Sequence, residues 1–183
     1  MDKKRKTLWV LIGISLVGGY LMMTTFSPSV RGTSGEVWSA VVSEKNPPFR
    51  LEMPGVPRHT IDQVSITVPQ PATLSTATLS VDDHEGNTYL LNLISLPPTF
   101  QSLPKETLFR IPFNPLLSNH DSILVSFEMS EDSAYFEVGK TDGGQSLRGI
   151  VSPKDNFLIL QAVTYAGLFP EKMAEKFFHS LTF

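Results

Sequence analysis

The stretch ATLSTATLSVDDHEGNTYLLNLISL, residues 72–96, decides the fold class of this chain. Apolar and polar side chains alternate along residues 72–81 and 88–96, and the short polar segment DDHEGN, residues 82–87, separates the two runs. Alternation places successive side chains on opposite faces of a strand, and Gly86-Asn87 is a pair typical of tight turns. Two strands joined by so few residues form an antiparallel hairpin.

The same pattern continues over most of the chain and predicts an α+β fold. Turn sequences such as SEDS, TDGG and PKDN separate the runs, which favours antiparallel hairpins over βαβ units. The segment FPEKMAEKFFHSLTF, residues 169–183, predicts a C-terminal helix that packs on the sheet. We expect an antiparallel sheet of about six to eight strands. Its further strands lie in residues 49–53, 61–68, 122–130, 134–140, 145–151 and 156–165. The apolar face of the helix comprises Met173, Ala174, Phe177, Phe178 and Leu181.

Two segments depart from this alternation. Residues 97–120 contain five prolines, and they predict a crossover with two short helical turns, the second capped by Asn114 with Pro115 at its first position. Residues 27–48 are predicted to form a linker rich in small and polar residues. Inside this linker, EVWSAVVSE has the apolar spacing of a short amphipathic helix, with a strand as the alternative.

The first residues predict a membrane anchor. Residues 1–6 are mostly basic and residues 7–26 carry no charge. About 20 helical residues cover a hydrocarbon core of about 30 Å, and the basic cluster keeps the N-terminus in the cytoplasm. We therefore expect a transmembrane helix over residues 7–26, in contact with lipid, and a folded domain across the membrane. The alternative is secretion after signal cleavage, for which Ser27-Pro28-Ser29 is a poor site.

Charge and cysteine content exclude several classes of function. After residue 6 the chain has 11 basic and 17 acidic side chains, a balance that argues against nucleic-acid binding. The absence of cysteine excludes disulfides, thiolate zinc sites, iron–sulfur clusters and a cysteine nucleophile. It also excludes the acylated cysteine of a bacterial lipoprotein.

The acidic segment at residues 82–85 is the first candidate metal site. Asp82, Asp83, His84 and Glu85 are all capable ligands. Adjacent residues at a strand end point in different directions, however, whereas a metal requires ligands that converge. A solvated hairpin turn explains all four residues, and we favour it over a metal site.

Other candidate sites are also better explained by structure than by chemistry. His59 and Asp62 are three residues apart in a predicted strand, so they should face opposite sides and form no catalytic dyad. GKTDGGQS, residues 139–146, places its lysine before the glycines, the reverse of a phosphate-binding loop. His120-Asp121 is expected in a turn, and His179 near the end of the last helix. No catalytic, cofactor or metal residue is predicted.

A resemblance adds to this interpretation. FRLEMPGVP (49–57), YLLNLISLP (89–97), GIVSPKDNFLILQAVT (149–164) and AEKFFHSL (174–181) follow one another in an order that resembles the PsbP-like fold over residues 45–183. That family has an antiparallel sheet flanked by helices, in extrinsic photosystem proteins and in small bacterial envelope proteins. The resemblance implies a binding or assembly module and supplies no catalytic motif. The chain departs from the family in its Pro-rich, shortened insertion and in its lack of a lipoprotein cysteine.

Together these observations predict a non-catalytic protein of the bacterial inner membrane, with a periplasmic domain over residues 49–183 that binds envelope proteins or helps to assemble a membrane complex. The sheet edge and residues 97–120 are the expected contact surfaces. The first alternative is a carrier or sensor of a small apolar ligand, held between the sheet and the C-terminal helix by Phe109, Phe113, Phe157 and Phe169. The second alternative is a hydrolase that uses His59 or His84.

Overall fold

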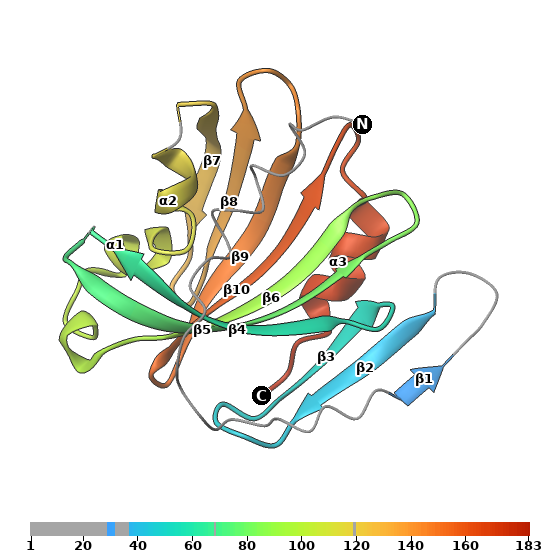
Figure 1. Cartoon of the computed structure of the whole chain (residues 1–183), viewed down its shortest axis with the longest axis horizontal. Coiled ribbons are helices and arrows are strands. Elements are labelled where there is room, and N and C mark those ends of the chain that lie inside the picture. Colours follow the sequence, from blue (N-terminus) through green and yellow to red (C-terminus); the bar gives the residue numbers. More distant parts are fainter. Residues whose placement is uncertain (1–28, 32–36, 68, 119) are drawn as a thin grey trace.

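The computed structural model describes residues 29–31, 37–67, 69–118 and 120–183. Among these residues, seven strands form one antiparallel sheet in the order β4-β5-β6-β10-β9-β8-β7 (Figure 1). The predicted antiparallel sheet is thus confirmed. Its strands are β4 (Arg58–Ile66), β5 (Ala72–Asp82), β6 (Thr88–Ser95), β7 (Ser122–Met129), β8 (Ala134–Lys140), β9 (Ser146–Lys154) and β10 (Phe157–Tyr165). A second, smaller sheet has the order β1-β2-β3, with β1 (Ser29–Arg31), β2 (Trp38–Ser43) and β3 (Phe49–Pro54).

The central strand β10 is buried on both of its faces. It pairs with β6 on one side and with β9 on the other. Leu158 and Leu160 pack in one hydrophobic cluster, whereas Ile159 and Val163 pack in a second cluster across the sheet. Burial on both faces explains why the sequence of β10 is almost continuously apolar, since a strand covered on both faces needs apolar residues at nearly every position.

One face of the sheet, which we call the α1 face, is covered by the segment between β6 and β7. This segment forms the 3₁₀ helix η3 (Pro98–Phe100) and the short helices α1 (Lys105–Arg110) and α2 (Asn114–Leu117). Phe100, Phe109 and Phe113 are buried there. The two predicted helical turns are confirmed. The predicted cap is wrong by one residue, because Asn114 is already helical and Phe113 occupies the cap position without a side-chain hydrogen bond.

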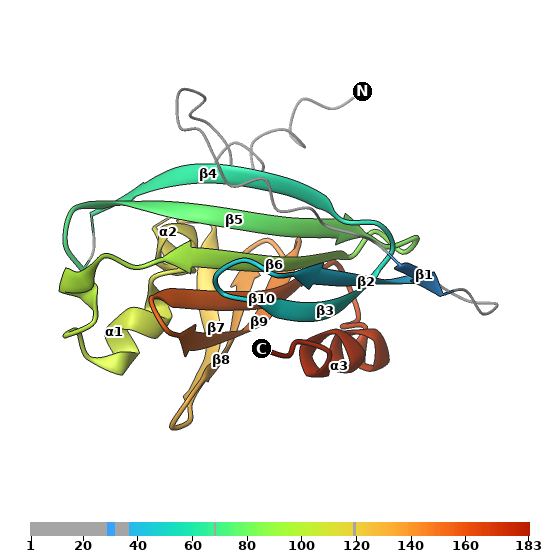
Figure 2. The same cartoon turned by 90° about the horizontal axis from the view of Figure 1, so that it is seen from below.

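The opposite face, which we call the α3 face, is covered by the small sheet and by the C-terminal helix α3 (Glu171–His179) (Figure 2). Leu51 and Met53 of β3 and Ala174 and Phe177 of α3 are fully buried. Phe177 contacts the ring of Tyr89 edge-on, with 5.6 Å between the ring centroids. The predicted apolar face of the helix is confirmed, since Met173, Phe178 and Leu181 also pack against this cluster.

The predicted linker and its amphipathic helix are wrong for Trp38–Ser43, which forms β2. Ser39, Val41 and Ser43 point into the α3-face cluster or its margin, whereas the residues between them are more exposed. The spacing of the apolar residues fits either structure, and pairing with β3 decides in favour of the strand. The folded domain therefore begins before residue 49.

The predicted membrane anchor, residues 7–26, lies outside the described residues. Within the part of the chain that the structure describes, no helix is long and apolar enough to cross a membrane. The anchor therefore stays a prediction of the sequence.

We expect that Gly149→Ala destabilises the fold. Gly149 lies opposite Phe136, and an added Cβ would stand 2.7 Å from the carbonyl oxygen of Gln161 and 2.8 Å from the Phe136 ring. The ring has little room to move, because it stacks on Phe113 with 4.4 Å between the centroids. The free energy of unfolding, measured by urea denaturation, should fall by about 1 to 3 kcal/mol or more.

The matched control for this substitution is Gly144→Ala. Gly144 is exposed in the turn between β8 and β9, and its nearest neighbour is the flexible carboxylate of Asp142. This change should alter the free energy of unfolding by no more than about 0.5 kcal/mol. Similar losses in both variants would contradict the close packing at Gly149.

Candidate functional site

The segment at residues 82–87 is a hairpin turn, as predicted. The Asp83 carboxylate accepts hydrogen bonds from the backbone N–H groups of Glu85 (2.9 Å) and Asn87 (2.8 Å) and from the Asn87 side chain (2.8 Å). The Asp82 carboxylate accepts from the Thr88 hydroxyl (2.7 Å) and from Arg58 (2.8 Å). Both carboxylates thus stabilise the turn. No group of three or more potential ligands in the described residues is arranged to hold a metal ion.

The four histidines belong to different segments of the fold. His59 is paired with Leu79 and faces the α3 side of the sheet, while Asp62 is paired with Thr76 and faces the α1 side. The two side chains thus face opposite sides of the sheet, as the strand period predicts. Partial burial lowers the pKa of His59 below its usual value of 6.5. His120 and His179 are exposed, in a turn before β7 and at the end of α3 respectively.

The glycine-rich segment between β8 and β9 is also a turn, as predicted. Asp142 accepts a hydrogen bond from the backbone N–H of Gly144 at 3.0 Å, and Gly143 has a φ of 71°, a conformation that favours glycine. The segment joins two antiparallel strands, and no described feature of it resembles a phosphate cradle.

The four phenylalanines expected around an apolar ligand do not form one group. Phe109 and Phe113 belong to the cluster on the α1 face, whereas Phe157 and Phe169 pack against the cluster on the α3 face. The sheet lies between the two pairs. The prediction of a single pocket lined by all four is therefore wrong, because the crossover after β6 and the helix after β10 cover opposite faces.

The Pro-rich segment 97–120 contributes four buried side chains to the core. Phe100, Phe109, Ile111 and Phe113 are each at most 3% exposed. Removing this segment would uncover the α1 face, so its main role in the structure is to cover the sheet. Both contact surfaces expected from the sequence stay predictions, because this segment also carries exposed residues such as Gln101 and Glu106, and the main sheet has two edge strands.

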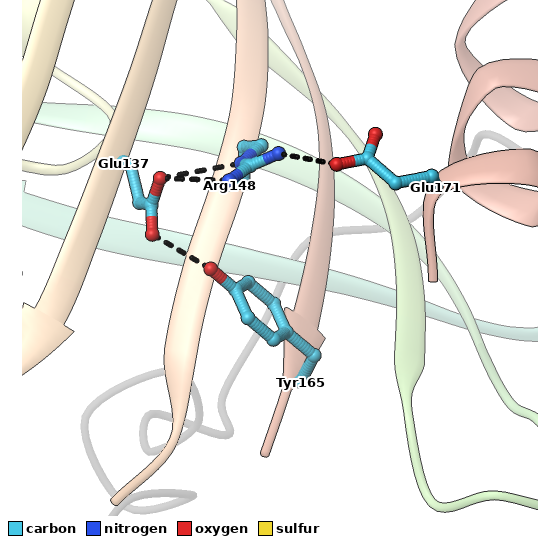
Figure 3. A network of polar contacts seen from close by, with 4 residues as sticks. All are labelled: Glu137, Arg148, Tyr165 and Glu171. Carbon is cyan, nitrogen blue, oxygen red and sulfur yellow. Dashed lines mark hydrogen bonds and ion pairs between the residues drawn. The ribbon is translucent and has the colours of Figure 1, made fainter. Parts of the chain in front are cut away.

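A polar network that the sequence analysis missed lies on the α3 face (Figure 3). Arg148 on β9 donates to Glu137 on β8 from Nη2 at 3.1 Å and from Nε at 3.2 Å, and to Glu171 on α3 at 3.4 Å. The Tyr165 hydroxyl donates to the other oxygen of Glu137 at 2.7 Å. The Arg148 guanidinium also lies 4.0 Å from the centre of the Phe169 ring.

This network fixes the start of α3 against the sheet. It joins three adjacent strands to the first residue of the helix, and the Tyr165 and Phe169 rings meet edge-on 5.0 Å apart. Burial raises the pKa of Tyr165 above its usual value of 10.0, and the hydrogen bond to Glu137 raises it further. No spacing in the sequence indicates the network, because Glu137 and Arg148 meet only through strand pairing.

Strand β7 forms an exposed edge beside this network. It pairs with β8 along one side and ends the order of strands in the main sheet. The side chains of Ile123 and Val125 are 49% and 56% exposed, and Tyr135 on β8 is exposed as well. A bulge between Leu124 and Ser126 adds Val125 to the strand and interrupts its pairing. The edge therefore presents apolar side chains and backbone groups together.

Tyr165→Phe tests the network. Removing a hydrogen bond to the partly buried Glu137 carboxylate should lower the free energy of unfolding at pH 7 by about 1 to 2 kcal/mol, whereas Tyr135→Phe on the exposed surface should have almost no effect. Because the folded-state pKa of Tyr165 is raised, this contribution is full below pH 10.0 and is lost as the pH rises through the folded-state value. Denaturant titrations at neutral pH and above pH 10.0 check both expectations, and equal losses for the two variants at pH 7 would contradict them.

Comparison with known proteins finds no family model and no curated protein that matches this chain.

Proposed function

We propose that this chain is a membrane-anchored, non-catalytic envelope protein whose domain binds a partner protein along β7. The exposed apolar edge of the main sheet carries this proposal. An edge strand offers a row of backbone N–H and C=O groups that a further strand can pair with, and the neighbouring side chains then select the partner. Burying Ile123 and Val125 would add a hydrophobic contribution to such pairing.

The composition of β7 supports an extended protein segment as the partner. Its sequence, SILVSFEM, contains a single charged residue, Glu128, and neither proline nor lysine, the residues that commonly protect edges. The other edge of the main sheet, β4, contains Arg58, His59 and Asp62 and is the more polar of the two. The bulge at Val125 interrupts the regular pairing of β7. A partner strand must match this irregular backbone, which disfavours non-specific strand pairing.

The anchor is the second part of the proposal. The basic cluster at residues 3–6 and the uncharged segment 7–26 support a single transmembrane helix, with the domain in the periplasm of a bacterium. The antiparallel sheet with helices on both faces supports membership of the PsbP-like fold family, which remains a proposal. Release of the domain after signal cleavage is the alternative for the anchor.

A crosslinking experiment tests the proposed edge. A photo-reactive amino acid at Ile123 of the full chain should trap a reproducible membrane-associated partner, because this position borders the open edge. Replacing Val125 by Lys in that labelled chain should reduce the trapped amount by about tenfold, since a charge would be desolvated in the contact.

The matched control keeps the photo-reactive residue at position 123 and places the lysine on β4 instead. Ile61 is 56% exposed, as Val125 is, and Ile61→Lys should leave the product trapped at position 123 unchanged. Thermal unfolding of both lysine variants verifies that each is folded. If Ile61→Lys and Val125→Lys reduce the trapped product equally, β7 is not the binding edge, and if position 123 traps no partner, the proposal of a binding domain fails.

A further inference from the structure

We infer that one end of the domain rests on the lipid surface and so fixes its orientation relative to the membrane. This end comprises the turn between β2 and β3, the C-terminal residues and the turn between β9 and β10, and we call it the lipid-facing end. The inference rests on the anchor in the proposed function and adds where the domain contacts the bilayer.

The connection between the proposed anchor and the domain is short. The uncharged segment ends at residue 26, and β1 begins at Ser29. Three residues of extended chain span at most about 11 Å. The headgroup layer on each side of the hydrocarbon core is itself about 5 to 8 Å thick. The start of β1 is therefore held at the headgroups or within a few ångströms of them.

Strand register shows which part of the domain is nearest to the lipid. Ser29 pairs with Ala40, and β1 and β2 are antiparallel. We take the chain to continue away from the membrane along β1, and the antiparallel pairing then makes β2 run back toward the membrane. Val42 and Ser43 lie beyond the level of Ser29, and the turn at residues 44–48 extends further in the same direction. This turn is thus directed at the bilayer.

The C-terminus is fastened at the same end. Arg50 and Thr182 exchange two backbone hydrogen bonds of 2.8 and 2.9 Å, so Phe183 lies level with the start of β3. The ammonium group of Lys154, beside the turn between β9 and β10, lies 5.4 Å from the centre of the Phe183 ring. In Figure 1 the C-terminus lies next to the turn between β2 and β3, at the bottom of the view.

The side chains at the lipid-facing end suit a membrane interface. Val42 and Phe183 are 41% and 50% exposed, and the basic residues Lys45, Arg50 and Lys154 accompany them. Aromatic and aliphatic groups with long basic side chains are favoured at the level of the headgroups. Glu44 and Asp155 offset two of the three basic residues, so this contact would depend on apolar burial as well as on charge.

Charge is unevenly distributed along the chain. Residues 37–54 and 154–183, which build the α3-face layer and the lipid-facing end, contain five basic and five acidic side chains. Residues 55–153 contain five basic and eleven acidic side chains. An anionic lipid surface repels this second part more strongly, although strand register puts the acidic turn between β7 and β8, with Glu131 and Asp132, at the same end of the strands as the turn between β9 and β10. In Figure 1 β7 begins near the top of the view, so the proposed orientation directs the start of β7 away from the lipid.

Single cysteines test this orientation, because the chain has no cysteine of its own. Val42→Cys and Val125→Cys both place a thiol at an exposed valine on a strand, one at the lipid-facing end and one on β7. Each full-length variant is labelled with an environment-sensitive fluorophore and reconstituted into vesicles of phosphatidylethanolamine and phosphatidylglycerol, with and without headgroup-attached spin labels. We expect spin labels to quench position 42 about threefold more than position 125, because quenching is confined to the headgroup layer.

Alkaline extraction of the same vesicles distinguishes a wrong orientation from a wrong anchor. If the chain stays in the membrane and both positions are quenched equally, the orientation is wrong while the anchor stands. If alkaline extraction releases the chain, both the anchor and the orientation that rests on it are wrong. Retention with preferential quenching at position 42 supports the orientation.

Discussion

Strand β10 has to be covered on both of its faces, and the rest of the structure depends on this requirement. Its side chains alternate between two separate hydrophobic clusters, represented by Leu160 on the α1 face and Ile159 on the α3 face. Burial of apolar surface is the main favourable contribution to folding, so neither face can be left to solvent. The chain covers one face with the helices between β6 and β7, and the other with β2, β3 and α3.

The elements that cover the centre of the sheet treat its outer parts differently: one part fixes α3, and, among the described strands, the edge at β7 stays unpaired. The network of Glu137, Arg148 and Tyr165 fixes α3 over the α3 face, and α3 in turn holds the C-terminal residues on β3. Beyond this network no described element pairs with β7 on its outer side. The same arrangement that completes the core thus leaves one apolar edge open, and this edge supports the proposed binding of a partner.

The two proposals describe one geometry. In the proposed geometry, a connection of a few residues between the membrane helix and β1 would restrain the domain at its lipid-facing end, where Val42 and Phe183 are exposed. The start of β7 would then lie farther from the lipid. A short tether combined with a fixed orientation would present β7 to neighbouring envelope proteins in one defined direction, which reduces the entropy lost on binding.

The alternating sequence by itself determined the strands, their antiparallel hairpins, the turn at Asp83 and the apolar face of α3, because these features depend on neighbours close in the chain. It also determined that residues 7–26 suit a membrane helix. Tertiary structure alone decided that Trp38–Ser43 is a strand, that the predicted phenylalanines lie on opposite faces, and that Glu137 meets Arg148. Those outcomes depend on which elements cover which face and on strand register, and contacts between distant residues set both.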